Sequence, residues 1–269
     1  MKVAFSTLGC PDWTWNDVVS TAKDLGYDGI EIRGIGSELH APDILEFSDE
    51  NIDNTLERLN KLGLEIPCLT SSCFLFEKDR AEINLKEGRE YVDLAQKLGV
   101  PFVRMLGDRN PEPGEKIDFH TVKENISELA SYSDGKGVKV LIETNGFFAD
   151  PAQILKLLDA VGSGNLGVLW DIHHPYRFMN VSADEAYKAL KDHICHVHMK
   201  DSVVQNGKIK YKMLGHGDVP VFEALNLLME DGYKGYVSLE WVKRWLSDLE
   251  EPGVVFSHFI SRIRRAIGK

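Results

Sequence analysis

The sequence is poor in cysteine and lacks the cysteine spacings of zinc knuckles and redox pairs. Only four cysteines occur in 269 residues, and no two of them form a Cys-x-x-Cys pair. Cys68 and Cys73 are near neighbours, but their spacing is not that of a zinc knuckle. We therefore predict a cytoplasmic protein whose thiols are reduced.

Basic charge and long apolar runs are also scarce. The formal net charge is −11, from 31 lysines and arginines against 42 aspartates and glutamates. Nucleic-acid binding usually needs a basic surface, so we expect no nucleic-acid partner. No stretch approaches the roughly 18 apolar residues of a membrane span, so we expect no membrane partner either. The opening MKVAFSTLGCP is too short for a signal peptide and predicts a first strand.

Short β-rich runs alternate eight times with longer amphipathic stretches, and several helices are predicted to end in glycine, as in DLGYDG and KLGLEI. Eight βα units without a linker or composition break predict an α/β fold, a single (β/α)8 TIM barrel over residues 1–269. An open doubly wound sheet would normally show a glycine-rich phosphate turn after an early strand, and none is present. The predicted strands are 2–6, 29–33, 65–70, 101–106, 138–143, 166–171, 194–199 and 235–240, and the predicted helices are 15–27, 50–63, 81–99, 118–137, 150–162, 182–192, 219–233 and 252–267.

Four consecutive predicted strands end in a side chain that can bind metal, namely Glu143, Asp171, His198 and Glu240. Barrel enzymes work at the carboxyl ends of their strands. Charged groups in apolar runs are costly to bury unless they are paired or coordinated. We therefore predict one divalent ion here, and this ligand set suits Mn²⁺, Mg²⁺ or Co²⁺ and permits Zn²⁺. The alternative is a buried salt-bridge cluster, but the strand-ending cations that could neutralise it, Arg33 and Arg104, are expected across the barrel.

The segment HICHVHMKDS raises the question of which histidine binds the ion. His196 and His198 share one face of the strand, but they are separated by about 6.5 Å. We assign His198 to the ion and His196 to local hydrogen bonds in the barrel interior, while His193 is expected to be structural. His174, three residues after Asp171, is predicted to orient substrate or transfer a proton, and a loop-capping role is the alternative.

Several other side chains are candidates for contact with substrate. Lys200 could meet an anionic or carbonyl oxygen, and Arg244 could hold a phosphate or carboxylate, although a solvated lysine and a surface salt bridge fit the sequence equally well. Whether His216 in the LGHGD loop reaches the site is left open. Aromatic residues in the predicted loops either form sugar-stacking walls or pack on the barrel rim; they are Trp13, Trp15, Phe74 and Trp241.

The set LIETN, LWDIHHP, HVHMKD, LGHGDVP and SLEWVKRW, in this order and spacing, resembles the xylose-isomerase-like TIM-barrel superfamily. The similar branch is that of the sugar phosphate isomerases and epimerases, and the resemblance covers essentially the whole chain. It implies that Glu143 and Glu240 bind the metal and also move the proton. Asp171 and His198 would complete the ligand set, and His174 would contact substrate.

The resemblance implies a divalent-metal-dependent isomerase or epimerase of a small sugar or keto-polyol. Such an enzyme abstracts a proton next to a metal-bound carbonyl. Ala149 lies near the place where the epimerases carry another glutamate, and His216 stands where a glutamate is common. A dehydratase of the inosose or dehydroshikimate type would use the same ligands and is the alternative. An abasic-site endonuclease would need further histidines that this chain lacks, and a non-catalytic binding protein is the fourth class. A homo-oligomer is left open.

Overall fold

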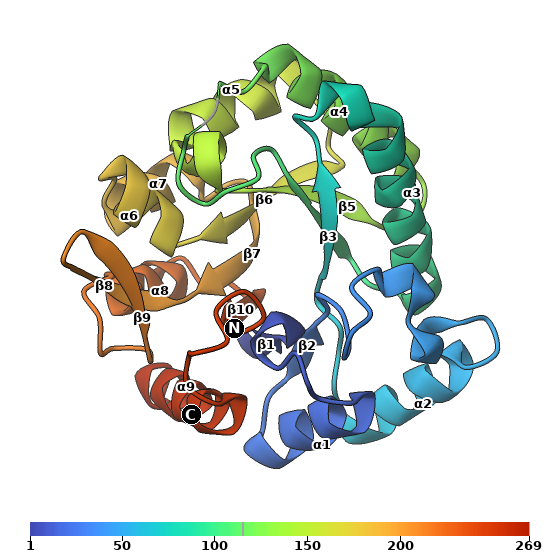
Figure 1. Cartoon of the computed structure of the whole chain (residues 1–269), viewed down its shortest axis with the longest axis vertical. Helices are drawn as coiled ribbons and strands as arrows, with labels where there is room; N and C mark the ends of the chain where they lie inside the picture. The colour runs from blue at the N-terminus through green and yellow to red at the C-terminus, as the bar shows by residue number, and fades with distance from the viewer. Residues whose placement is uncertain (115, 269) are drawn as a thin grey trace.

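A ring of parallel strands, enclosed by helices, forms the body of the protein (Figure 1). The structure is a computed structural model that describes residues 1–114 and 116–268. Within these residues the ring strands are β1 (Lys2–Ser6), β2 (Gly29–Glu31), β3 (Leu69–Phe74), β4 (Phe102–Leu106), β5 (Lys139–Glu143), β6 (Leu166–Asp171), β7 (Ile194–Met199) and β10 (Tyr236–Leu239).

The eight strands pair in the order β2-β1-β10-β7-β6-β5-β4-β3. The two ends of this order are joined by isolated parallel bridges, Gly29 with Glu65 and Ile32 with Leu69. The Ile32 backbone N–H donates to the carbonyl of residue 68 at 3.2 Å, and the Ile32 carbonyl accepts from the N–H of residue 70 at 2.9 Å. The ring is therefore closed, and the TIM-barrel prediction is confirmed.

The helices lie outside the ring, and the bounds that the sequence predicts hold within a few residues for most of them. Gly26, Gly63 and Gly99 each end a helix in the left-handed conformation, as the glycine phrases predict. The α-helices are α1 (Trp15–Leu25), α2 (Ile52–Leu62), α3 (Ala81–Leu98), α4 (Phe119–Tyr132), α5 (Pro151–Val161), α6 (His173–Met179), α7 (Ala183–Leu190), α8 (Val221–Glu230) and α9 (Pro252–Ala266). Short 3-10 helices are η1 (Thr7–Gly9), η2 (Ala41–Asp43), η3 (Leu45–Phe47), η4 (Lys78–Arg80) and η5 (Gly146–Ala149).

Three features differ from the sequence prediction. The third strand was predicted over residues 65–70, but it covers 69–74, so that Phe74 lies at its carboxyl end rather than in a loop. The short helix α6 follows β6 directly. A hairpin of β8 (Asp201–Gln205) and β9 (Lys208–Lys212) follows β7 and lies apart from the ring (Figure 1).

The alternation of side chains along the strands determines what fills the barrel. Leu141 of β5 and Leu169 of β6 pack with Cys68 in a small buried cluster that is separate from the large core beneath the helices. Glu143 and Asp171 lie two residues further along the same strands, and therefore on the same inward face. An apolar layer thus supports the carboxylates from below. Among the described residues, no helix combines the length and hydropathy that crossing a membrane requires.

Candidate functional site

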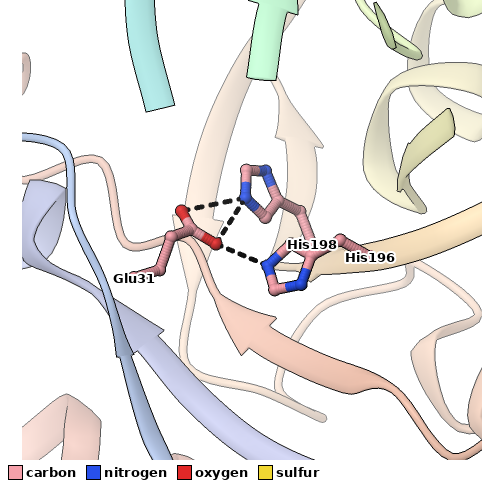
Figure 2. Close-up of side chains that lie close together, drawn as sticks. All are labelled: Glu31, His196 and His198. Carbon is pink, nitrogen blue, oxygen red and sulfur yellow. Dashed lines mark hydrogen bonds and ion pairs between the residues drawn. The ribbon is translucent and has the colours of Figure 1, made fainter. Parts of the chain in front are cut away.

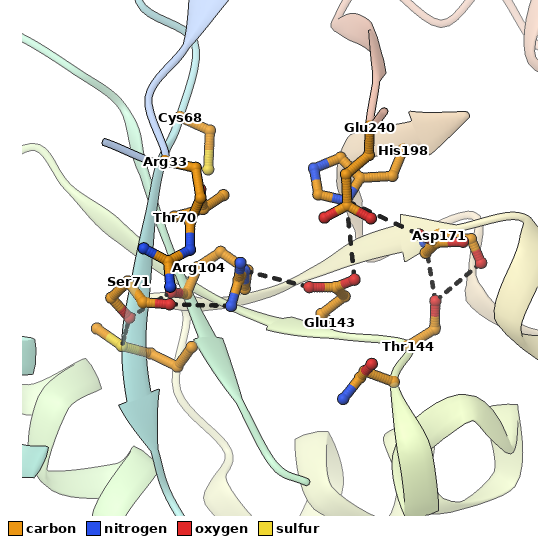
Figure 3. A network of polar contacts seen from close by, with 12 residues as sticks. Arg33, Cys68, Thr70, Ser71, Arg104, Glu143, Thr144, Asp171, His198 and Glu240 are labelled. Atoms are coloured by element: carbon orange, nitrogen blue, oxygen red, sulfur yellow. Dashed lines mark hydrogen bonds and ion pairs between the residues drawn. The ribbon is translucent and has the colours of Figure 1, made fainter. Parts of the chain in front are cut away.

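The four predicted ligands meet at the carboxyl end of the barrel (Figure 3). Their nearest donor atoms all lie within 4.8 Å of one another. The Nδ1 atom of His198 is 3.4 Å from Glu240, 3.7 Å from Glu143 and 3.9 Å from Asp171. This buried nitrogen has no hydrogen-bond partner among the described residues. An unpaired imidazole nitrogen facing three carboxylates is a donor set that fits a divalent cation.

Glu31, at the end of β2, determines which nitrogen of His198 faces the carboxylates (Figure 2). The Nε2–H of His198 donates to the Glu31 carboxylate at 2.9–3.0 Å, and the Nε2–H of His196 donates to the same group at 2.7 Å. All three side chains are completely buried. Burial opposes the charge of Glu31, but the charges and hydrogen bonds of the two histidines outweigh it and hold its pKa well below the usual value. Carboxylates behind metal-binding histidines commonly fix the ring in this way.

His196 is buried in the barrel interior, as expected from its place on the strand, and its hydrogen bond goes to Glu31. Sequence reasoning missed Glu31 itself. The signal was present in GIEIR, because a glutamate in the middle of an apolar strand must find a partner once it is buried.

Two buried cations accompany the carboxylates. The Lys200 ammonium contacts both Asp171 and Glu240. The Arg104 Nε atom lies 3.1 Å from Glu143. Arg104 was expected on the opposite side of the barrel, and this expectation is wrong, because β4 is the direct neighbour of β5 and their registers place Arg104 against Leu141. Burial opposes the charge of Glu143, but Arg104, His198 and His174 together outweigh it and lower the pKa of this carboxyl.

His174 is the second residue of the short helix after β6 and is buried beside the ligands. Its Nδ1–H donates to the backbone carbonyl of Thr144 at 2.9 Å. Its Nε2 atom therefore has a free lone pair, and it lies 3.7 Å from Asp171. Burial is the main cause that lowers the pKa of His174, so the ring is neutral at neutral pH. A neutral His174 can accept a hydrogen bond from a hydroxyl group in the cavity.

A cavity of about 480 Å³ opens above these residues. This volume lies within the usual range for small-molecule sites. The lining comprises the strand ends, the loops after β4, β5 and β10, and Tyr211 from the hairpin. Its residues are Leu8, Arg33, Phe74, Arg104, Leu106, Arg109, Asn110, Pro111, Glu143, Asn145, His174, Lys200, Tyr211, Glu240, Val242, Trp245 and Leu246.

Three predicted substrate contacts do not line this cavity. Trp241 is buried in the core, and its indole N–H donates to the carbonyl of residue 250 at 3.0 Å. Arg244 donates to the carbonyl of Gly36 at 2.9 Å. His216 is exposed, and its ring lies 5.0 Å from that of residue 258. The His216 loop is held by the Asp201 carboxylate, which accepts backbone N–H groups from residues 215, 217 and 219.

The aromatic residues named from the sequence divide between the two expected roles. Phe74 lines the cavity, whereas Trp13 and Trp15 pack edge to face on Phe256 and Phe47. Sequence reasoning missed two further aromatic residues of the lining, Tyr211 and Trp245.

The chain belongs to the xylose isomerase-like TIM barrel family, whose sequence pattern matches residues 19–256. It is similar to fructoselysine 3-epimerase of Shigella flexneri, with 23% identity over 280 residues, which cover 98% of this chain and 97% of that protein. It is also similar to inosose isomerase of Halalkalibacterium halodurans, with 27% identity over 236 residues, or 80% and 78% of the two chains. The crystal structure of the IOLI protein with a zinc atom shares the fold, with a TM-score of 0.80 and 18% identity over 100% of this chain and 98% of that chain.

Proposed function

We propose that this protein is a divalent-metal-dependent isomerase or epimerase of a keto sugar or keto-polyol. The observation that carries the proposal is the unpaired Nδ1 of His198 facing the carboxylates of Glu143, Asp171 and Glu240. The two curated relatives, an epimerase of fructoselysine and an isomerase of inosose, support a substrate with a carbonyl beside a carbon that bears hydrogen. The zinc in the IOLI structure supports a divalent metal.

In this proposal Glu143, Asp171, His198 and Glu240 hold the ion. A bound divalent ion supplies Lewis acidity, which makes the C–H beside a carbonyl more acidic. The protein's own task is then to take up and return the proton. Arg104 lies against Glu143 and favours its ionised form, which a base must have before it takes up a proton, and Lys200 lies against Glu240. An epimerase uses one base on each face of the substrate, whereas an isomerase returns the proton to the neighbouring carbon.

The remaining polar groups of the cavity orient the substrate. We propose that His174 accepts a hydrogen bond from a substrate hydroxyl through Nε2, because its Nδ1–H is already committed to the backbone. We propose that Lys200 donates to a substrate oxygen, since it is the buried ammonium that lines the cavity. We propose no substrate contact for Trp241, Arg244 or His216, because they lie outside the lining.

Metal analysis of protein purified without chelator tests the ligand set. Asp171→Ala and His198→Ala should each lose the ion. His196→Ala is the matched control, because it removes an imidazole from the same face of the same strand and should retain the ion. Stoichiometric metal in both Asp171→Ala and His198→Ala would contradict the assignment.

Deuterium exchange tests the chemistry. We expect NMR of keto sugars and inososes in heavy water to show exchange of the C–H beside the carbonyl in at least one substrate. Glu143→Gln and Glu240→Gln keep the shape and an oxygen donor but remove a base, so each should slow exchange by about 10²- to 10⁴-fold. Full exchange in both variants, with metal bound, would remove these residues from the chemistry. Exchange lost in only one variant would favour a single-base isomerase or a dehydratase.

A further inference from the structure

The cavity wall carries a buried arginine that forms no ion pair with any described residue. Arg33 follows β2, lines the cavity and is 8% exposed. Its guanidinium donates to the carbonyl of Leu39 at 3.3 Å and to the Ser72 hydroxyl at 2.5 Å. Among the described residues, no carboxylate lies within 4.0 Å of it. Glu87 is close enough to act on its charge, but this carboxylate accepts the backbone N–H of Ser72 instead.

The other cations of the lining are paired. Arg104 lies against Glu143, Arg109 contacts Glu77, and Lys200 contacts Asp171 and Glu240. Figure 3 shows Arg33 next to Arg104, so that two guanidinium groups adjoin at one end of the carboxylate cluster. Buried charges are normally paired, and an unpaired one is costly. Arg33 therefore stands out as a charge that the protein itself does not neutralise.

The charged form of Arg33 persists despite this cost. Burial first, and then the neighbouring charge of Arg104, lowers the pKa of Arg33 to about 10, so the group is still a cation at neutral pH. The indole of Trp245 lies over it, with 5.7 Å from the guanidinium carbon to the ring centroid. Trp245 is 55% exposed and Leu246 is 41% exposed, and both line the cavity. A guanidinium fixed between a hydroxyl and an indole, with donors left over, is preorganised for a planar or tetrahedral oxyanion.

We propose that Arg33, beneath Trp245, forms an oxyanion subsite that binds a carboxylate or phosphate group of the substrate. The assignment of this anion to the substrate rests on the proposed function. In that setting a divalent ion would offset two of the three charges of Glu143, Asp171 and Glu240, and Glu31 behind them adds one more negative charge. Arg33, Arg104 and Lys200 would then leave the site with an excess of about one positive charge. An anionic substrate restores the balance, with its carbonyl near His198 and its acidic group near Arg33.

The test uses the full-length protein and two simple probes, inorganic phosphate and acetate. The chain has five tryptophans, so its ¹⁵N–¹H spectrum should contain five indole signals, and Trp245→Phe assigns the one above Arg33. We expect saturable shifts of this signal with phosphate, acetate or both, while the other four indole signals stay in place. The larger response indicates whether the natural group is a phosphate or a carboxylate. The titrations are run on the protein as purified and again after chelation, because anions also bind metal ions.

Arg33→Gln should weaken anion binding by at least about tenfold, as expected for the loss of a charge-assisted hydrogen bond. Arg265→Gln is the matched control, because it removes the same charge from an exposed position in α9 and should change nothing. Arg33→Lys keeps the charge but loses the planar fork, so it should bind more weakly than the wild type, and it provides the test if Arg33→Gln does not fold.

A Trp245 signal that responds to neither anion, or that saturates equally in the wild type and the Arg33 variant that folds, would overturn the proposal. The readout requires no turnover. If no keto sugar or inosose exchanges its proton but anion binding still depends on Arg33, the proposed reaction is wrong and the anion subsite stands. If deuterium exchange occurs but anion binding does not depend on Arg33, the anion subsite is wrong and the proposed reaction stands.

Discussion

Replacement of Glu31 by glutamine should weaken metal binding although Glu31 is not one of the four ligands. Its carboxylate accepts both Nε2–H groups, from His196 at 2.7 Å and from His198 at 2.9–3.0 Å. A glutamine side chain replaces one of the two carboxylate oxygens with an NH2 group. This group would point its N–H toward the Nε2–H of one histidine, where no acceptor is then left. The ring of His198 can relieve this conflict by moving its proton to Nδ1, the atom that faces Glu143, Asp171 and Glu240, and the ion then loses a ligand.

The expected magnitude follows from these contacts. Loss of a carboxylate behind a metal-binding histidine typically lowers metal affinity by about 10- to 100-fold. The lost charge-assisted hydrogen bonds should also cost roughly 1.5–3 kcal/mol of stability, because Glu31 is fully buried. Calorimetric titration with Mn²⁺ measures the first effect, and thermal unfolding without metal measures the second.

His196→Gln is the control for Glu31→Gln. It disturbs the same carboxylate but leaves the hydrogen bond from His198 in place, so it should lower stability and change metal affinity much less. Wild-type metal affinity in a folded Glu31→Gln protein would show that the tautomer of His198 is not set by Glu31, and the reasoning would fail.

Three further outcomes follow from the site. Lys200→Met should destabilise the metal-free protein by about 3–5 kcal/mol, because Asp171 and Glu240 lose their buried counter-charge. It should also tighten metal binding, because a competing cation is gone. Thermal melts should therefore show a lower Tm without metal and a larger rise of Tm on addition of metal than in the wild type. Burial opposes a second proton on His198, but Glu31, Glu240 and Glu143 together outweigh burial and raise its pKa well above 6.5. From pH 6.5 up to the raised pKa, metal binding must therefore release a proton and affinity should rise with pH, which calorimetry in buffers of different ionisation enthalpy would detect. His174→Ala should raise KM and leave the metal content unchanged, as metal analysis beside steady-state kinetics would show.

Much of the architecture and the candidate ligand set follow from local patterns in the sequence. Strands and helices alternate with glycine at the helix ends, and parallel strands bring their carboxyl ends to one rim. For this reason the sequence alone places Glu143 and Asp171, which are 28 positions apart in the chain, next to one another. The same logic placed His196 below His198, because two residues along a strand change the layer but not the face.

The contacts that the sequence did not predict are those between strands distant in the chain and those made by loops. Glu31 reaches the histidines because β2 and β7, which β1 and β10 separate in the ring, both direct these side chains into the barrel interior. Strand alternation alone does not say which inward side chains meet there. The position of Arg104 was predicted wrongly because it depends on how β4 pairs with β5. That pairing places Arg104 against Leu141 and close to Glu143. The hairpin was missed although Asn206-Gly207 lies between β-rich runs, a strong indication of a tight turn. The loop of His216 is held by the Asp201 carboxylate, and the Arg244 side chain is directed to the carbonyl of Gly36, and neither contact could be read from the sequence.

The two ends of the cavity come from different halves of the polypeptide. The candidate ligands all follow residue 142, whereas Arg33, Phe74, Arg104 and Arg109 all precede residue 110. Under the proposed function, the residues of the reaction and many of those that would bind the substrate are encoded by separate stretches of the gene, and Glu31 links the two. Exchange of the first four βα units with those of a relative would therefore be a route to new substrates with an unchanged reaction, provided that the exchanged segment keeps a carboxylate at position 31.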